Sequence, residues 1–308
     1  MNKIIKNILK TSVSVILIVI LLFAFDIKVI LDLLSNINLF YLGLIISFFL
    51  MSFLIPAIGM KILLIPVKNN KIEIENLYWY NLLTYGISRF LPGRIGDASI
   101  IYFLKKEDIP IGIGTAIALI DKIIVFFVQT MFAVVGFFIF FSTEVALKLT
   151  IISFFIFVLA MFFITWEKGR LLIRKYILRK HSEKFSKFYL TFSNYFKKHI
   201  LLLIANIILA TVKTLFFGFL IYLAFIAVNV NPNINLITIM IIASVINIIS
   251  IIPITIAGLG ARESISVLLF NELGITPEVT ISAFIILLFV RYVSSATLLL
   301  YYTWKKKH

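Results

Sequence analysis

Long apolar runs dominate this sequence and constrain its fold more than any other feature. A helix rises about 1.5 Å per residue, so about 20 apolar residues cross a hydrocarbon core about 30 Å thick. The chain is 62% hydrophobic and 14% charged, whereas soluble domains average about 45–50% apolar and about 25% charged. We expect an all-α polytopic membrane protein with about six full spans, near residues 8–25, 38–62, 111–141, 149–166, 200–228 and 279–303.

Two further apolar regions, 76–104 and 237–270, are interrupted by glycine, proline and charge. The first carries LPGRIGDAS at Leu91–Ser99, and the second carries IPITIAGLGARES at Ile252–Ser264. A backbone break at membrane depth survives only where it lines a cavity or packs inside protein. Paired breaks in the two halves of a chain point to a transporter site. The predicted break residues are Pro92, Gly93, Gly96, Pro253, Gly258 and Gly260.

The distribution of basic residues predicts the orientation of the chain. The loop 167–199 carries ten lysines and arginines against two glutamates, and its scattered apolar residues predict amphipathic helices on the membrane surface. This loop should be cytoplasmic, as should both basic termini, in a cell-membrane protein. The linkers 26–36, 142–148 and 229–235 carry little net positive charge and should be external. The formal net charge of +15 then indicates contact with anionic membrane lipids rather than nucleic acid.

Counting spans from the basic loop places both ends of 76–104 inside and both ends of 237–270 outside. About 30 residues make two half-helices more readily than two full spans, so we expect two opposed re-entrant hairpins. The order span, hairpin, span then occurs twice, in opposite orientation. This predicts an inverted repeat of about 38–141 and 200–303 within one integral membrane domain, 1–308. The alternative is that apolar chains with Gly/Pro kinks resemble one another by chance.

The N-terminus and the rare residue types narrow the classes of function. Three lysines precede the first apolar run, as in a signal peptide, but no small-residue cleavage site follows Phe25, which favours an uncleaved helix. The absence of cysteine excludes disulfides and thiolate chemistry. The histidines are His181, His199 and His308, all in basic loop or tail sequence, so we expect no metal site and no cofactor.

Charged residues expected at membrane depth are the candidate site. Each costs at least about 2.5–3.5 kcal/mol at a helix centre, so a functional role is the default hypothesis. Cations outnumber anions six to three, and an enclosed cavity with that surplus would bind an anion, of which phosphate is the first candidate. The candidate phosphate-binding cations are Arg89, Arg94, Lys122, Lys213, Arg262 and Arg291, and the candidate charge partners or proton carriers are Asp97, Asp121 and Glu263.

Several of these residues have a simpler structural alternative. Asp121 and Lys122 could form a helix-end pair at the interface, although adjacent residues do not face each other on a helix. Lys213 could snorkel, and Arg89 could anchor its segment at a headgroup. Asp97 could cap a helix that starts after the first break.

At these residues the chain resembles the lysylphosphatidylglycerol synthase transmembrane-region family, also described as flippase-like. The similarity covers nearly the whole chain and is carried by Asn81–Ser99, Thr115–Lys122, Ile252–Ser264 and the arginine at position 291. The family more often has Glu-Arg where this chain has Asp121–Lys122, which keeps the charges but loses a bidentate guanidinium.

The resemblance implies movement of a polar lipid headgroup across the bilayer. Larger members continue into a soluble aminoacyltransferase domain, which this sequence does not show, so we expect no aminoacyl-lipid synthesis by this chain alone. The predicted function is a lipid translocase for an anionic phospholipid or a polyprenyl-phosphate lipid, without an ATP-binding motif. Two alternatives stay open: a membrane-embedded headgroup or glycosyl transferase, and an accessory subunit of a separate transferase.

Overall fold

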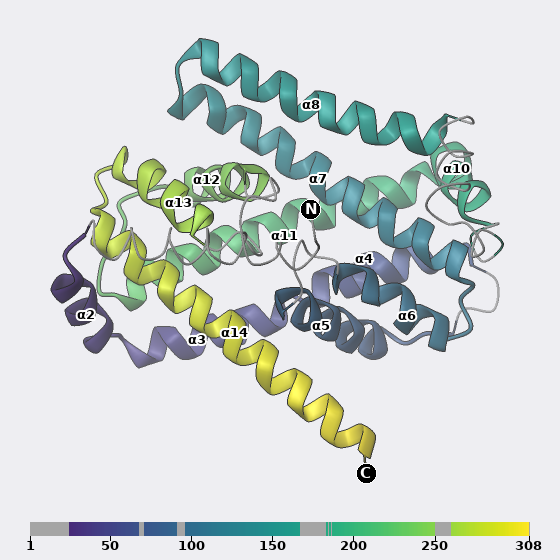
Figure 1. Ribbon diagram of the computed structural model, residues 1–308, viewed down its shortest axis with the longest axis horizontal. Coiled ribbons are helices and arrows are strands. Elements are labelled where there is room, and N and C mark those ends of the chain that lie inside the picture. The colour runs from purple at the N-terminus through teal and green to yellow at the C-terminus, as the bar shows by residue number, and fades with distance from the viewer. Residues whose placement is uncertain are drawn as a thin grey trace, which may run out of the picture. The chain divides into compact units, whose positions relative to one another are not determined.

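The computed structural model describes residues 25–67, 71–90, 96–166, 183, 185, 187–249 and 260–307, and the regular elements in these ranges are helices (Figure 1). The chain forms two compact units. Unit 1 comprises residues 1–52, 85–96 and 213–308, and unit 2 comprises 53–84 and 97–212. Each unit is described by itself.

Unit 2 is built around one long helix, α7, against which α4, α6, α8 and α10 pack. Residues Ile117, Ile120, Ile124 and Val128 recur at helical spacing along α7 and are buried, so one stripe of the helix forms the core of the unit. In Figure 1, α7 and α8 run side by side as a hairpin. The helices of the unit are α4 (Leu54–Leu64), the first part of α5 (Ile74–Phe90), α6 (Ser99–Lys106), α7 (Ile111–Phe140), α8 (Thr143–Thr165), α10 (Phe188–Lys198) and the first half of α11 (Ile200–Ala227).

The described part of the basic loop is an amphipathic helix, as the sequence predicts for this stretch. Phe192 and Tyr195 of α10 are buried, whereas Leu190 and the two lysines at 197 and 198 are exposed. The Tyr195 hydroxyl donates a hydrogen bond to the Leu63 carbonyl, which ties α10 to the end of α4. The apolar face of α10 therefore packs on protein. Residues 167–182 of the loop lie outside the described residues.

Unit 1 is built along α14, which packs on α2, α3 and α13, while α13 also packs on α12 (Figure 1). Helices α11 and α12 approach closely at Gly218, where an added Cβ would lie 3.1 Å from the Cα of Met240. Small residues permit such close approach between apolar helices. The helices of the unit are α2 (Ile27–Ser35), α3 (Leu39–Met51), the last turns of α5, the second half of α11, α12 (Leu236–Ile249), α13 (Ala261–Asn271) and α14 (Pro277–Lys307).

Within the described residues, four segments are long and apolar enough to cross a membrane: Leu39–Leu64, Ile111–Phe140, Ile200–Ala227 and Pro277–Trp304. They match four of the predicted spans. The predicted span 149–166 lies within α8, a 23-residue helix with many exposed apolar side chains, among them Ile151, Phe155 and Val158. The predicted span 8–25 falls almost entirely outside the described residues.

Three boundaries differ from the prediction. The segment 38–62 is not one continuous helix: α3 ends at Met51 and α4 begins at Leu54, because Pro56 has no N–H for the Ser52 carbonyl. Much of the predicted linker 26–36 is helical, with Asp26 capping α2 through a 2.9 Å hydrogen bond from the Lys28 amide. Helix α8 begins at Thr143, so the predicted linker 142–148 is also largely helical.

Among the described residues, each predicted interruption lies between two helices that are shorter than a typical span of about 20 residues. The first region comprises α5, of 17 residues, and α6, of 8 residues. The second comprises α12, of 14 residues, and α13, of 11 residues. Re-entrant hairpins and the inverted repeat remain predictions, as does the assignment of 1–308 to one domain.

Candidate functional site

Two buried arginines of unit 1 lie over a single aromatic ring. The guanidinium carbon of Arg291 lies 5.0 Å from the ring centroid of Phe217, and that of Arg262 lies 5.9 Å from it. The two arginines are only 5% and 6% exposed, respectively. Because an aromatic face attracts cations, the half-buried Phe217 ring stabilises two positive charges that have left solvent.

Arg262 occupies its position because α13 starts immediately after the second break. Gly260 has φ = +81°, a left-handed conformation that favours glycine, and its N–H donates a 2.7 Å hydrogen bond to Oε2 of Glu263. An acidic side chain in the first turn also complements the positive end of the helix dipole. The turn therefore fixes the start of α13, and Arg262 is its second residue.

The Arg262 guanidinium also connects the two helices on either side of the break. Its Nη2 donates a hydrogen bond to Oδ1 of Asn247, which lies near the end of α12 and is 8% exposed. Within α13, the Ser266 hydroxyl donates a 2.6 Å hydrogen bond to the Arg262 carbonyl. The side chain of Arg262 is therefore held from α12 and its backbone from the next turn of α13.

Arg291 and its neighbours bring further polar groups to the same region of unit 1. Tyr292 lies within electrostatic range of Arg89, Glu263 and Arg291, and its ring meets that of Phe90 edge-on, with centroids 6.0 Å apart. The Arg89 guanidinium lies over the ring of Tyr85 on its own helix, 4.4 Å from the centroid. The end of α5 and the middle of α14 thus bring Arg89 and Arg291 to the same tyrosine.

Among the described groups around Tyr292 and Phe217, three arginines face one glutamate. Both ring distances are measured to one centroid, so the Cζ atoms of Arg262 and Arg291 are at most about 11 Å apart. At an effective dielectric constant of about 20, two like charges at that separation repel by about 1.5 kcal/mol. Lys213, one turn before Phe217 on α11, lies on the same helix face. A bound anion would relieve this repulsion.

In unit 1, the backbone at Gly96 lies close to the last turns of α5. A Cβ added there would lie 2.5 Å from the Ser88 amide nitrogen and 2.7 Å from the Ile87 carbonyl carbon. Backbone atoms of a helix cannot move aside as the end of a flexible side chain can. Position 96 therefore excludes any residue larger than glycine. The predicted residues Pro92, Gly93, Arg94, Pro253 and Gly258 lie outside the described residues.

In unit 2, Asp121 and Lys122 lie about 15 Å along α7 from its first residue, well away from that helix end. Lys122 Nζ is 3.8 Å from Oδ2 of Asp121, so the expectation that these adjacent side chains would not meet was wrong: the long lysine stem reaches round. The Asp121 side chain is 12% exposed and that of Lys122 is 49% exposed. Asp97 is half-buried and does not cap α6, whose N-cap is Ala98 without a side-chain hydrogen bond.

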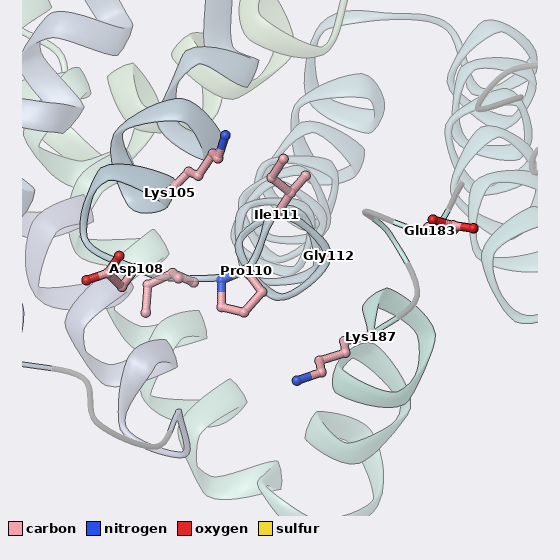
Figure 2. A pocket seen from close by; sticks show the side chains of 8 residues that line it. Lys105, Asp108, Pro110, Ile111, Gly112, Glu183 and Lys187 are labelled. Atoms are coloured by element: carbon pink, nitrogen blue, oxygen red, sulfur yellow. The ribbon is translucent and has the colours of Figure 1, made fainter. Parts of the chain in front are cut away.

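Unit 2 also has an open pocket of about 450 Å³ at the start of α7 (Figure 2). Its charged side chains come from two sides: Lys105 lies in the last turn of α6 and Asp108 follows that helix, whereas Glu183 and Lys187 precede α10. Between them lie Pro110, Ile111 and Gly112. Positive and negative groups are equal in number here, in contrast to the arginine-rich cluster of unit 1.

The family of the chain follows from its comparison with known families. The sequence model described as the lysylphosphatidylglycerol synthase TM region matches residues 7–298, which include both breaks, the Asp121–Lys122 pair and Arg291. The chain belongs to this family. No curated protein matches it. Membership of the lysylphosphatidylglycerol synthase TM-region family, together with the four long apolar helices, identifies a multi-pass membrane protein.

Some residues of the cluster were not predicted from the sequence of this family member. Asn247 carried a usable signal, because an amide in an apolar helix needs a partner. Phe217 carried none, since it is one of 31 phenylalanines in an apolar chain. Its role follows only from the position of its ring beside the two guanidinium groups.

Proposed function

We propose that this protein is a lipid translocase that moves an anionic phospholipid or a polyprenyl-phosphate lipid across the membrane. The observation that carries the proposal is the pair of buried arginines, Arg262 and Arg291, at one ring beside a helix break. Membership of the lysylphosphatidylglycerol synthase TM-region family is consistent with a lipid substrate.

The chemistry of the pair fits a phosphate group. Guanidinium groups form bidentate, charge-assisted hydrogen bonds with phosphate oxygens and remain charged at any physiological pH. Burying two guanidinium groups carries a desolvation cost, and a bound phosphate would offset part of it with charge-assisted hydrogen bonds to both. In the proposed site Arg262 and Arg291 hold the headgroup phosphate. Arg89 and Lys213 add positive potential.

The helix breaks support a transport pathway. The helices of 8 to 17 residues that flank the two breaks resemble the discontinuous helices that form transporter sites. In the proposed topology the first region enters and leaves on the cytoplasmic side and the second on the external side, with both termini and the loop 167–199 inside. Arg94 and Lys122 stay predicted phosphate ligands. Asp97, Asp121 and Glu263 stay predicted charge partners, with Asp97 and Glu263 the predicted proton carriers.

The transferase alternative receives no support from Glu263. A general base needs a carboxylate that can reach its proton, and Glu263 already accepts the hydrogen bond of the Gly260 N–H inside the cap of α13. Translocation needs no such base, so it remains the proposal.

The experiment is native mass spectrometry of gently purified protein. Wild-type protein should retain an anionic lipid, and R262K/R291K protein should retain much less, because lysine keeps the charge but loses the bidentate geometry. K148A is the matched control, since Lys148 forms an exposed pair with Glu144 at the start of α8. Equal retention of anionic lipid by the wild type and the double variant would overturn the proposed site.

A further inference from the structure

Four helices of unit 1 each contribute one side chain to a single cluster. Phe217 comes from α11, Asn247 from α12, Arg262 from α13 and Arg291 from α14. The two arginines belong to the proposed phosphate site, whereas Phe217 and Asn247 carry no charge. The contacts of Phe217 and Asn247 with the two arginines indicate the role of each residue.

Asn247 precedes and Arg262 follows residues 250–259, which lie outside the described residues. The hydrogen bond between them is the described side-chain link that joins the end of α12 to the start of α13. With Asn247 8% exposed and Arg262 6% exposed, the bond is shielded from water, and breaking it leaves buried polar groups to be satisfied again. Any movement of α13 away from α12 must break this bond.

Phe217 acts on both arginines through the negative face of its ring. A leucine of comparable bulk would fill the space but would not attract a guanidinium. The guanidinium groups of Arg262 and Arg291 repel each other. The attraction of each group to the Phe217 ring opposes this repulsion and keeps the two groups close together. The ring therefore sets the spacing of the two guanidinium groups.

We propose that Phe217 and Asn247 are positioning residues: Phe217 holds Arg262 and Arg291 at the spacing that one phosphate-bearing headgroup requires, and Asn247 couples α12 to α13 through Arg262. The role of Phe217 in spacing the two arginines for a headgroup rests on the proposed function. The coupling of α12 to α13 by Asn247 does not. Binding of a headgroup phosphate at Arg262 competes with Asn247 for Nη2 and thereby loosens α13 from α12.

The first test replaces Phe217 by mono-, di- and trifluorinated phenylalanine. Fluorination keeps the shape of the ring and removes the negative charge of its face step by step, so a packing role would not respond to it. Two quantities are measured in purified full-length protein: hydrogen exchange of the α13 amides, and the affinity for a short-chain anionic phosphodiester lipid, with inorganic phosphate as a parallel probe. The same series at Phe219, whose ring packs on Phe48 with centroids 5.1 Å apart, is the control.

At position 217 we expect exchange of α13 to rise stepwise and lipid affinity to fall by about tenfold across the series, because both cation–ring contacts weaken together. At position 219 both quantities should stay at the wild-type level. Flat α13 exchange across the Phe217 series overturns the positioning role of Phe217. Stepwise exchange with no binding of either probe supports positioning and overturns the proposed lipid site. Binding of free phosphate alone identifies a phosphate ion as the ligand and overturns the headgroup.

The second test separates the coupling from the packing of Asn247. N247L keeps the size of the side chain and removes the acceptor, whereas N247D keeps an acceptor for Arg262. We expect N247L to raise exchange in α13 several-fold and N247D to restore it to the wild-type level. If N247L exchanges as slowly as the wild type, the coupling across the break is wrong.

Discussion

Gly96 lies directly against the backbone of Ser88, so the described end of the first break packs on the last turns of α5. A Cβ at Gly96 would lie 2.5 Å from the Ser88 nitrogen, where the neighbouring atoms belong to a helix backbone and cannot turn aside. At Gly96 the backbone therefore packs so closely on α5 that it leaves no room for a side chain.

G96A should therefore destabilise the protein, by about 1–3 kcal/mol if the overlap is relieved by backbone shifts. The measurement is the thermal midpoint in detergent. G43A is the matched control, because Gly43 lies in α3 with nothing within 4 Å of its added Cβ. Alanine favours the helix there, so G43A should be neutral or stabilising. Equal midpoints for G96A and the wild type would contradict the close packing of the break.

Tyr195 should make stability depend on pH in the alkaline range. Burial raises the pKa of the Tyr195 phenol above its usual 10.0, and the hydroxyl donates to the Leu63 carbonyl only while protonated. Above about pH 10 the unfolded chain loses this proton before the folded chain does, so the folded state is progressively disfavoured as pH rises. Y195F has no phenolic proton to lose, so its free energy of unfolding should fall less than that of the wild type between pH 9 and pH 11. Parallel loss in Y195F and the wild type would show that Tyr195 does not contribute.

The first hairpin can be tested by labelling, since the chain has no cysteine of its own. We expect K71C and D108C to react with a membrane-impermeant thiol reagent from the cytoplasmic side only. Helix α6 has 8 residues and spans about 12 Å, too short to cross the bilayer, so shared sidedness would leave a re-entrant turn. Labelling from opposite sides would exclude the first hairpin.

The second hairpin should show the opposite pattern. N235C precedes α12 and E272C follows α13, and both should react from outside. Helices of 14 and 11 residues again fall short of a full span. If both positions react only from the cytoplasm, the proposed inversion of the two halves is wrong.

The structure shows why some elements were predictable from sequence and others were not. The helix starting at Ile111 follows from the length of its apolar run and from the preceding Pro110. Helix α2 was missed because nine residues gain little from helix propensity, and its buried residue Ile30 packs in a small cluster with Val267 and Ile281. Tertiary packing of this kind leaves no periodic signal in so short a segment.

The same distinction holds for the site. Arg262, Glu263 and Arg291 were selected because charge is costly in apolar helices, and the structure buries all three. Phe217 could not be predicted from the sequence, because nothing in the sequence around an aromatic residue of an apolar helix indicates that it will contact arginine side chains. The structure adds the shared ring, from which the spacing of the arginines follows.

The central claim is that buried arginines move an anionic headgroup, and lipid translocation in proteoliposomes tests it most directly. Labelled anionic lipid should cross in vesicles with wild-type protein and with K148A, which removes an exposed cation of α8. In R291A the rate should fall at least about tenfold, the effect of losing about 1.4 kcal/mol of interaction with the headgroup. If R291A protein translocates the lipid as fast as the wild type, Arg291 does not hold the headgroup and the account fails.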